Sequence, residues 1–446
     1  MKQQKNVREI ALDLLEMIEK KQSYSNLLLN QAIKKYELTP VDTGLLTELV
    51  YGTLQRKITL DYFLEPFLKK KTAGWVVQLL RLTLYQMVYL DKIPAHAAVY
   101  EAVEIAKKRG RKGISGMVNG VLRNIQRKGL PDLSQIQDET LRLSIETSHP
   151  LWLVKQWVEQ YGFEKTKEMC VMNLQPATQT ARVNTTKINR EELLTLLREE
   201  GFAVEPGTVL PEAVKSLKGN LAFSQAFKKG YLTIQDESSM IVAYALDLRE
   251  NQTVLDACAA PGGKSTHIAE KLSGTGRVIS LDIHRHKIKL IEENAARLGL
   301  KNIEAKQLDS REAGKVFPKE FFDRILVDAP CSGFGVLRRK PDIKYTKTDG
   351  DIDRLQQTQL EILQSVAPLL KRGGLLVYST CTVNIAENRE VAEAFLSKHA
   401  DFEGDVDFKN RLPESIRSLA RTFDLQIFPQ DFGTDGFYIA CLRRKV

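Results

Sequence analysis

Two cysteines stand where two apolar runs end. Cys331 follows the run FFDRILVDAP, Cys381 follows GGLLVYST, and short runs rich in Ile, Leu and Val are typical of buried strands. In an open parallel sheet, ligands bind at the carboxyl ends of the strands. The pattern therefore predicts two thiols at one edge of a sheet.

Two thiols at a ligand site suit the methylation of carbon 5 of cytosine. That carbon is a poor nucleophile until a thiolate adds to carbon 6 and breaks the aromaticity of the ring. A carboxylic acid at ring nitrogen 3 would stabilise the adduct, and a base must then remove the carbon 5 proton. Cys381, Cys331 and Asp328 are the candidates for these roles, and chemistry alone does not decide which cysteine attacks. A single cysteine near a strand end is more often a small buried apolar side chain, which is our interpretation of Cys170 and Cys441.

A glycine pair, Gly262 and Gly263, follows a predicted strand at 253–257. Such glycines let the backbone approach a ligand at the N-terminus of the next helix. Asp282 ends the second predicted strand, 19 residues beyond Gly263, where an acid typically binds ribose hydroxyls. A lone glycine pair more often serves only a tight turn, but the acid favours a ligand.

The glycine loop lacks both common phosphate-binding patterns. Cys258 stands where a P-loop needs its first glycine, and Gly262 and Gly263 are adjacent instead of spaced as GxGxxG. A cofactor with adenosine and ribose but no pyrophosphate fits such a loop. S-adenosylmethionine is a cofactor of that kind.

Two further acids end predicted strands. Asp309 follows a strand at 303–308 and Asp328 follows one at 323–327. An acid at a strand end is often only a loop start or a helix cap. Three acids in succession at one edge favour ligand contact, so we expect Asp309 near the adenine and Asp328 near the reacting group.

Composition narrows the class of protein. The five cysteines form no CxxC pair, which argues against a disulfide framework and a structural zinc site, so we expect reduced thiols and no metal. No segment reaches membrane-spanning length, and the charged N-terminal residues lack the apolar core of a signal peptide. We therefore expect a soluble cytoplasmic protein.

Positive charge is concentrated at the N-terminal end. The first 130 residues hold 22 Lys and Arg against 12 Asp and Glu, whereas the remainder has a net charge of −1. Such an excess indicates an acidic partner, most simply nucleic acid, although a soluble helical surface is the plainer alternative. Cations at 107–112 and 123–128 are predicted phosphate contacts, and the loop LRRKPDIKYTK at 337–347 is either a further contact or merely solvated.

The apolar periodicity predicts a multidomain chain. Residues 1–135 are expected to form an all-helical domain, with helices near 7–18, 41–56, 60–68, 75–91, 95–109 and 113–127. A small α+β module is expected at 136–237, after the break GLPDLS. An α/β Rossmann-like domain is expected at 238–446, and it contains the candidate residues for methyl transfer. Two tryptophans, Trp152 and Trp157, more often pack in a core than stack on bases.

The helical domain resembles the NusB family. The phrases VREIALDLLEMIE, ELVYGTLQRKITLDYFL and IPAHAAVYEAVEIAKK followed by VNGVLRNI carry this resemblance over about 130 residues. It implies an RNA-binding helical module.

The remainder of the chain resembles the RNA cytosine carbon-5 methyltransferases. The phrases DACAAPGGKSTH, LDIH, VDAPCSGFGVLRRKPDIKY, LVYSTCTVNIAENREVAEAFL and GTDGFYIACLRRK carry the resemblance. It implies that Cys381 is the nucleophile and that Cys331 assists release of the methylated base. It also places S-adenosylmethionine on Cys258, Ala259, Ala260, Pro261, Gly262, Gly263, Lys264, Asp282, Asp309 and Asp328.

The combination of the two domains resembles the methyltransferases that act on 16S ribosomal RNA. The leading hypothesis is a monomeric enzyme acting on that RNA, either free or in a 30S assembly intermediate. The alternatives are a transfer RNA or large-subunit RNA substrate and, from another class, a non-catalytic RNA-binding or antitermination protein.

Overall fold

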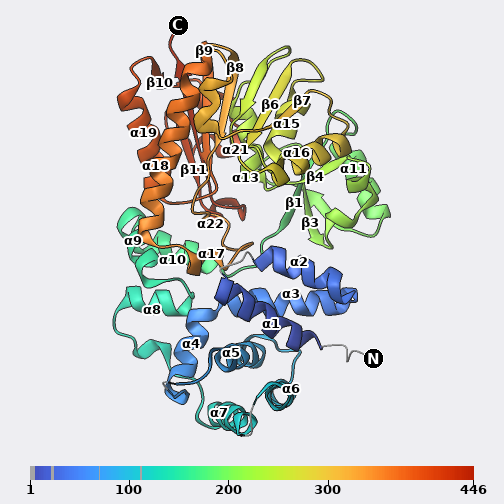
Figure 1. Cartoon of the computed structure of the whole chain (residues 1–446), viewed down its shortest axis with the longest axis vertical. Helices are drawn as coiled ribbons and strands as arrows, with labels where there is room; N and C mark the ends of the chain where they lie inside the picture. Colours follow the sequence, from blue (N-terminus) through green and yellow to red (C-terminus); the bar gives the residue numbers. More distant parts are fainter. Residues whose placement is uncertain (1–5, 22–24, 70, 111–112) are drawn as a thin grey trace. The chain divides into compact units, whose positions relative to one another are not determined.

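The chain forms two compact units. The computed structural model describes residues 6–21, 25–69, 71–110 and 113–446. One unit comprises Met1–Gln175 with Leu337–Thr346, and the other comprises Pro176–Val336 with Lys347–Val446. Figure 1 shows the elements of each unit. Within the described residues no helix is both long and apolar enough to cross a membrane.

The first unit is helical, as its periodicity predicts. All the predicted helices are present, and α2 was not anticipated. The helices are α1 (Val7–Lys21), α2 (Ser25–Tyr36), α3 (Pro40–Gln55), α4 (Lys57–Leu64), α5 (Gly74–Tyr89), α6 (Ala95–Arg109), α7 (Ile114–Lys128), α8 (Glu139–Glu146), α9 (Leu151–Tyr161), α10 (Phe163–Met172) and α17 (Ile343–Thr346).

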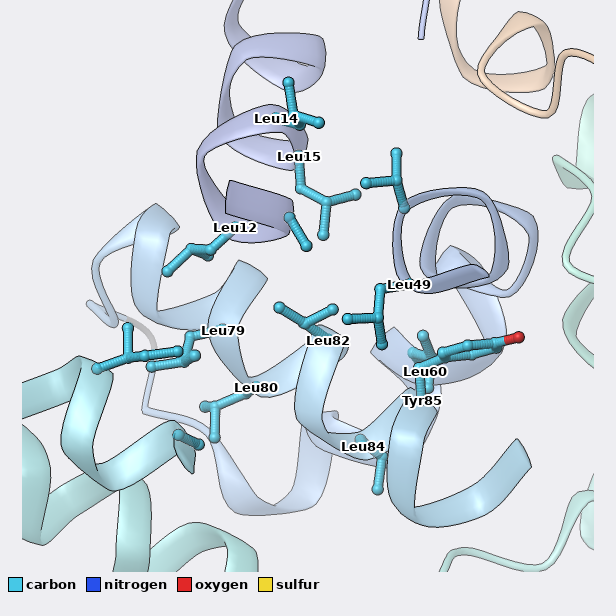
Figure 2. Packing of buried hydrophobic residues seen from close by; sticks show 14 of the residues in the cluster. Leu12, Leu14, Leu15, Leu49, Leu60, Leu79, Leu80, Leu82, Leu84 and Tyr85 are labelled. Carbon is cyan, nitrogen blue, oxygen red and sulfur yellow. The ribbon is translucent and has the colours of Figure 1, made fainter. Parts of the chain in front are cut away.

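The core of this unit is formed by leucine-rich helix faces. Ile10, Leu14 and Ile18 lie four residues apart on α1, and all three are buried. They belong to one cluster with apolar residues of α3, α4 and α5, part of which Figure 2 shows. Trp157 on α9 is also fully buried, so packing is the correct interpretation of that ring.

Residues Leu337–Thr346 belong to the helical unit although they follow Cys331 in the chain. Lys344 Nζ donates to the Gln55 carbonyl at 3.1 Å, and the Tyr345 hydroxyl donates to the Leu54 carbonyl at 2.8 Å. Lys344 is fully buried. Both predictions for this lysine, phosphate contact and simple solvation, are therefore wrong. Lys344 is buried by contacts with a distant part of the chain, and the residues around it in the sequence do not indicate those contacts.

Lys344→Met is expected to change how stability depends on pH. Burial lowers the pKa of Lys344 to about 7, whereas an unfolded lysine has a pKa of about 10.4. Between these values the unfolded chain binds the additional proton, so the free energy of unfolding rises with pH across this window and is lowest below pH 7. The variant should lose this contribution, and calorimetric melting temperatures from pH 6.5 to 9 should show a steeper rise for the wild type.

A matched control for this prediction is Lys155→Met, which changes an exposed lysine of the same unit. It should melt with the pH dependence of the wild type. Equal pH dependence in the wild type and Lys344→Met would contradict the prediction.

The second unit contains a small antiparallel sheet with the strand order β2-β3-β1-β4. Helices α11 and α12 pack on it, which gives the α+β module that the sequence predicts. The elements are β1 (Gln179–Val183), α11 (Arg190–Glu199), β2 (Ala203–Pro206), β3 (Ala213–Lys218), α12 (Gln225–Lys228) and β4 (Leu232–Ile234).

The same unit contains a larger, mostly parallel sheet with the order β10-β12-β9-β8-β5-β6-β7. The five strands from β5 to β9 are parallel, and β12 pairs with β9 in the antiparallel sense. The strands are β5 (Thr253–Asp256), β6 (Arg277–Asp282), β7 (Ile303–Gln307), β8 (Phe322–Asp328), β9 (Leu370–Thr380), β10 (Phe402–Gly404), β11 (Asp424–Ile427) and β12 (Phe437–Arg444).

Helices cover both faces of the large sheet, which confirms the doubly wound α/β fold (Figure 1). Alternation along the strands explains this arrangement, because neighbours such as Val254 and Leu255 point to opposite faces and enter different apolar clusters. The flanking helices are α13 (Glu237–Met240), α14 (Val242–Ala245), α15 (Gly263–Lys271), α16 (Arg285–Leu298), α18 (Asp349–Val366), α19 (Arg389–Lys398), α20 (Phe408–Arg411), α21 (Glu414–Arg417) and α22 (Pro429–Phe432).

Candidate functional site

A cavity of about 390 Å³ lies where the parallel strands end. Its volume falls within the range of about 300–1,000 Å³ that is usual for small-molecule sites. The order β8-β5-β6 contains the switch point of the sheet, where ligands are expected. Among the predicted site residues, the lining includes Cys258, Ala260, Asp282, Asp309, Asp328, Cys331 and Cys381.

The two predicted thiols are in contact. Cys331 Sγ lies 3.4 Å from Cys381 Sγ, although 50 residues separate them in the chain. Strands β8 and β9 are parallel neighbours, so the residues that follow them emerge side by side. The prediction that both thiols occupy one sheet edge is confirmed.

Gly335 fixes the spacing of the two cysteine loops. Its amide donates to the Cys381 carbonyl at 2.9 Å, and its carbonyl accepts from the Gly436 amide at 2.9 Å. A Cβ atom on Gly335 would lie 1.9 Å from the Gly436 oxygen. Glycine is required here because three backbone segments meet with no room for a side chain.

Gly335→Ala is expected to separate the two thiols and to reduce activity strongly. The added methyl group must displace backbone atoms, which costs about 1–3 kcal/mol in a packed site. Methylation of RNA by the variant should fall at least about tenfold, since small misplacements of reacting groups have large effects on rate. Gly350→Ala is the control, because no atom lies within 4 Å of its added Cβ. Full activity of Gly335→Ala would contradict this role.

Contact with Cys381 affects the protonation of Cys331. The hydrogen bond with Cys381, followed by burial and the charge of Cys381, raises the pKa of Cys331 well above its ordinary value. Two thiolates 3.4 Å apart would repel each other strongly. The contact therefore favours a state in which only one of the two sulfurs is ionised, and either sulfur can donate the hydrogen bond between them.

Asp328 and Lys264 form an ion pair beside these thiols. Lys264 Nζ lies 2.7 Å from Asp328 Oδ2, and the Ser379 hydroxyl donates to Asp328 Oδ1 at 2.8 Å. Burial alone would lower the pKa of Lys264, but the charge and hydrogen bond of Asp328 outweigh it and raise that pKa. The pair holds a carboxylate and an ammonium group next to Cys381.

The loop between β5 and α15 has the backbone that its glycines predict. Gly262 has a φ of 101°, and a Cβ there would lie 3.2 Å from the Ile291 Cα. Helix α15 begins at Gly263, so its first amides lack partners within the helix. The loop can therefore present backbone donors to an anionic group.

The acids at the strand ends have different partners. Asp282 accepts from the His284 amide at 2.9 Å, and it lines the cavity. Asp309 forms an ion pair with Arg311 at 2.7 Å, and the hydrogen bond from that arginine lowers the pKa of Asp309. Arg311 also lines the cavity.

A cofactor with an adenosine part fits the polar and apolar groups that line this cavity. Carboxylates at the ends of β6 and β7 can accept from hydroxyl and amino groups, while Ile283, Leu308 and Ala329 provide apolar walls. The adjoining loop and the start of α15 contain four further predicted residues that do not line the cavity, namely Ala259, Pro261, Gly262 and Gly263.

Arg182 supports the loop between β5 and α15, and no sequence pattern predicts this role. This fully buried arginine of β1 donates to the Gly263 carbonyl at 2.9 Å and pairs with Glu270 at 2.9 Å. A buried arginine in a strand has no local signature, because its partners lie more than 50 residues away. The small α+β module thus contributes directly to the position of the loop.

The cations predicted as phosphate contacts are partly paired. Lys107, Lys108 and Arg109 form ion pairs with Glu104, Glu9 and Glu16 respectively, at 2.6–3.1 Å. Exposed pairs of this kind contribute little to stability and remain open to exchange with a phosphate. The predicted contacts Arg111 and Lys112 lie outside the described residues.

Comparison with known proteins agrees with these features. Residues 243–443 match the 16S rRNA methyltransferase RsmB/F family, residues 5–127 the NusB family, and residues 149–221 a ferredoxin-like domain of RsmF/B-like methyltransferases. A probable ribosomal RNA small subunit methyltransferase B from Bacillus subtilis is 58% identical over 99% of each chain.

Solved structures show the same fold. The crystal structure of PH0851 has a TM-score of 0.82 and 25% identity, with complete coverage of both chains. A methyltransferase homologue from Pyrococcus horikoshii has a TM-score of 0.58 and 27% identity, over 70% of this chain and 100% of that one. The chain belongs to the RsmB/F family of 16S rRNA methyltransferases.

Proposed function

We propose that this protein methylates carbon 5 of a cytosine in 16S ribosomal RNA through a covalent adduct with Cys381. The observation that carries the proposal is the 3.4 Å contact between two thiols beside an ion pair and a nucleoside-sized cavity. Bound S-adenosylmethionine would supply the methyl group, and the residues expected to hold it are the loop 258–264 with Asp282 and Asp309.

Cys381 is the nucleophile in this proposal. Its thiolate adds to carbon 6 of the cytosine, and the electron pair of the 5,6 double bond becomes available at carbon 5. Lys264 lies close enough to Cys381 for the charge of the thiolate to affect the lysine. That cation favours the thiolate over the thiol.

Asp328 and Lys264 stabilise the adduct. The Asp328 carboxyl is assigned to ring nitrogen 3, and the Lys264 ammonium bound to it supplies the proton that a carboxylic acid needs there. Because the pair is fixed by Ser379 as well, it needs little reorganisation as charge develops on the ring.

Cys331 becomes a base when it is needed. The charge and hydrogen bonding of Cys381 are among the causes that raise the pKa of Cys331, and both disappear once Cys381 is bonded to carbon 6. Cys331 then loses its proton to water and takes the proton from carbon 5. The 5,6 double bond reforms, the bond from carbon 6 to Cys381 breaks, and the pair returns to one thiol and one thiolate.

The choice of 16S ribosomal RNA is supported by the named function of the relatives, including the one from Bacillus subtilis. The helical unit matches the NusB family over residues 5–127, which fits a role in engaging RNA. A transfer RNA or large-subunit substrate would use the same chemistry. A non-catalytic RNA-binding protein would have no use for the contact between two thiols.

The test is methylation in vitro with S-adenosylmethionine and unmodified 16S, 23S and transfer RNA. The expected result is 5-methylcytidine in 16S RNA alone, measured by mass spectrometry of nucleosides and located by bisulfite sequencing. Methylation of another RNA would replace the substrate assignment. The absence of both methylation and calorimetric S-adenosylmethionine binding would support the non-catalytic alternative.

A further inference from the structure

A buried carboxylate, Glu387, lies beneath both cysteine loops. Its Oε1 accepts from the Ser332 amide at 2.7 Å, and its Oε2 accepts from the Ser332 hydroxyl at 2.5 Å. Ser332 is the residue next to Cys331 in the chain. Glu387 is fully buried and has no role in the mechanism described above.

The network around Glu387 joins the two loops to each other. The Ser332 hydroxyl lies 2.8 Å from the Thr382 hydroxyl, and Thr382 follows Cys381 directly. Gln359 Nε2 donates to the Pro330 carbonyl at 2.9 Å and to Glu387 at 3.3 Å. The residues on either side of Cys331, and the one after Cys381, thus belong to one buried hydrogen-bond network around Glu387.

The hydrogen bonds define how the network is oriented. Three donors point at the Glu387 carboxylate, namely the Ser332 amide, the Ser332 hydroxyl and Gln359 Nε2. Because the Ser332 hydroxyl donates to the carboxylate, its oxygen is free to accept from the Thr382 hydroxyl. The chain from Thr382 through Ser332 to Glu387 therefore runs in one direction and fixes both hydroxyls.

A buried charge is a costly way to hold a loop. Burial raises the pKa of Glu387 above its usual value in spite of the hydrogen bonds from Ser332, and the three donors that converge on its oxygens favour the ionised form. A neutral or apolar residue would pack here at a smaller desolvation cost, so stability alone does not explain a carboxylate. A charged acceptor gives stronger and more directional hydrogen bonds than a neutral one, which suits a group that must fix a reacting thiol.

We propose that Glu387 is a positioning residue for release of the methylated base. Through Ser332 it holds the Cys331 loop against the Cys381 loop, so that Cys331 reaches the carbon 5 proton of the adduct formed on Cys381. This inference rests on the proposed function. Glu387 acts through Ser332 and touches neither substrate nor cofactor.

Glu387→Gln tests this role with little change of shape. The amide keeps an acceptor for the Ser332 amide but replaces the charged acceptor of the Ser332 hydroxyl with a donor. If the lost hydrogen bond to a charged group raises the barrier to release by its full contribution, the release step becomes about 10–100-fold slower. Under single-turnover conditions with 16S RNA, the covalent protein–RNA adduct should therefore accumulate on denaturing gels, with the KM for RNA unchanged.

Two controls separate positioning from a general loss of structure. Asp405→Asn removes another buried carboxylate of the same unit, which bonds Arg443 at the amino-terminal side of the sheet. It should lower the melting temperature without accumulating adduct. Ser332→Ala removes the hydroxyl that links Glu387 to Thr382 but leaves the carboxylate in place, so it should also accumulate adduct.

Cys331→Ser in the same assay distinguishes failure of the positioning role from failure of the proposed function. Adduct with Cys331→Ser but none with Glu387→Gln would overturn the positioning role and leave the proposed function intact. No adduct with Cys331→Ser would instead overturn the roles of the two cysteines. Adduct accumulation by Asp405→Asn to the same extent as by Glu387→Gln would also overturn the positioning role.

Discussion

Cys331→Ser is expected to trap the protein on its RNA as a covalent adduct. Cys381 keeps its neighbours Lys264 and Asp328 in this variant, so attack on carbon 6 and methylation of carbon 5 can still occur. A serine hydroxyl is a far weaker base than a thiolate, so the carbon 5 proton stays in place and Cys381 cannot leave. Turnover should fall at least about 10³-fold while the adduct approaches one equivalent per protein, measured on denaturing gels with labelled RNA.

Cys381→Ser is the control variant, and we expect it to give the opposite result to Cys331→Ser. It lacks the thiolate that attacks the ring, so it should form no adduct and lose activity by about 10⁴-fold or more. The double variant should behave like Cys381→Ser, since release is irrelevant when no adduct forms. Adduct with Cys381→Ser and none with Cys331→Ser would reverse the two roles.

The strand ends could be predicted from sequence because their signal is local. Apolar runs followed by Asp282, Asp328 or a cysteine indicate both a buried strand and the place where it stops. Parallel strands bring such residues to one edge, so the contact of Cys331 and Cys381 follows from two short patterns and the class of fold. The order in which we propose that the two thiols act rests on family resemblance, because strand ends alone do not distinguish an attacking thiol from a releasing one.

The residues that support the site could not be predicted, because their role depends on distant partners. Glu387 lies in the phrase NIAENRE, where it resembles any acid of a helix start, and only the folded chain places it against Ser332. Arg182 and Gly335 are similar cases, since each is defined by backbone atoms from another segment. Helix α2 was not predicted for a different reason. Few of its 12 residues are buried, so its apolar periodicity is weak.

Asp328→Asn is expected to slow the attack step about 10²–10³-fold. Asparagine is nearly the same size and can still accept from the Ser379 hydroxyl, but it removes the charge that pairs with Lys264 at 2.7 Å. The largely buried ammonium then loses its counter-ion, and the ring loses the carboxyl assigned to nitrogen 3. The KM for RNA should change little, because the lost interaction develops mainly as charge builds on the ring.

The step affected by Asp328→Asn can be isolated in the Cys331→Ser background, where adduct formation reports attack and methylation without release. The double variant should form adduct at the reduced rate but to the same final extent as Cys331→Ser. Asp323→Asn is the matched control, because Asp323 lies on the same strand, at the opposite end, and bonds Lys371 and the Thr253 amide. Unchanged adduct kinetics with Asp328→Asn would show that the acid stabilising the ring is another group.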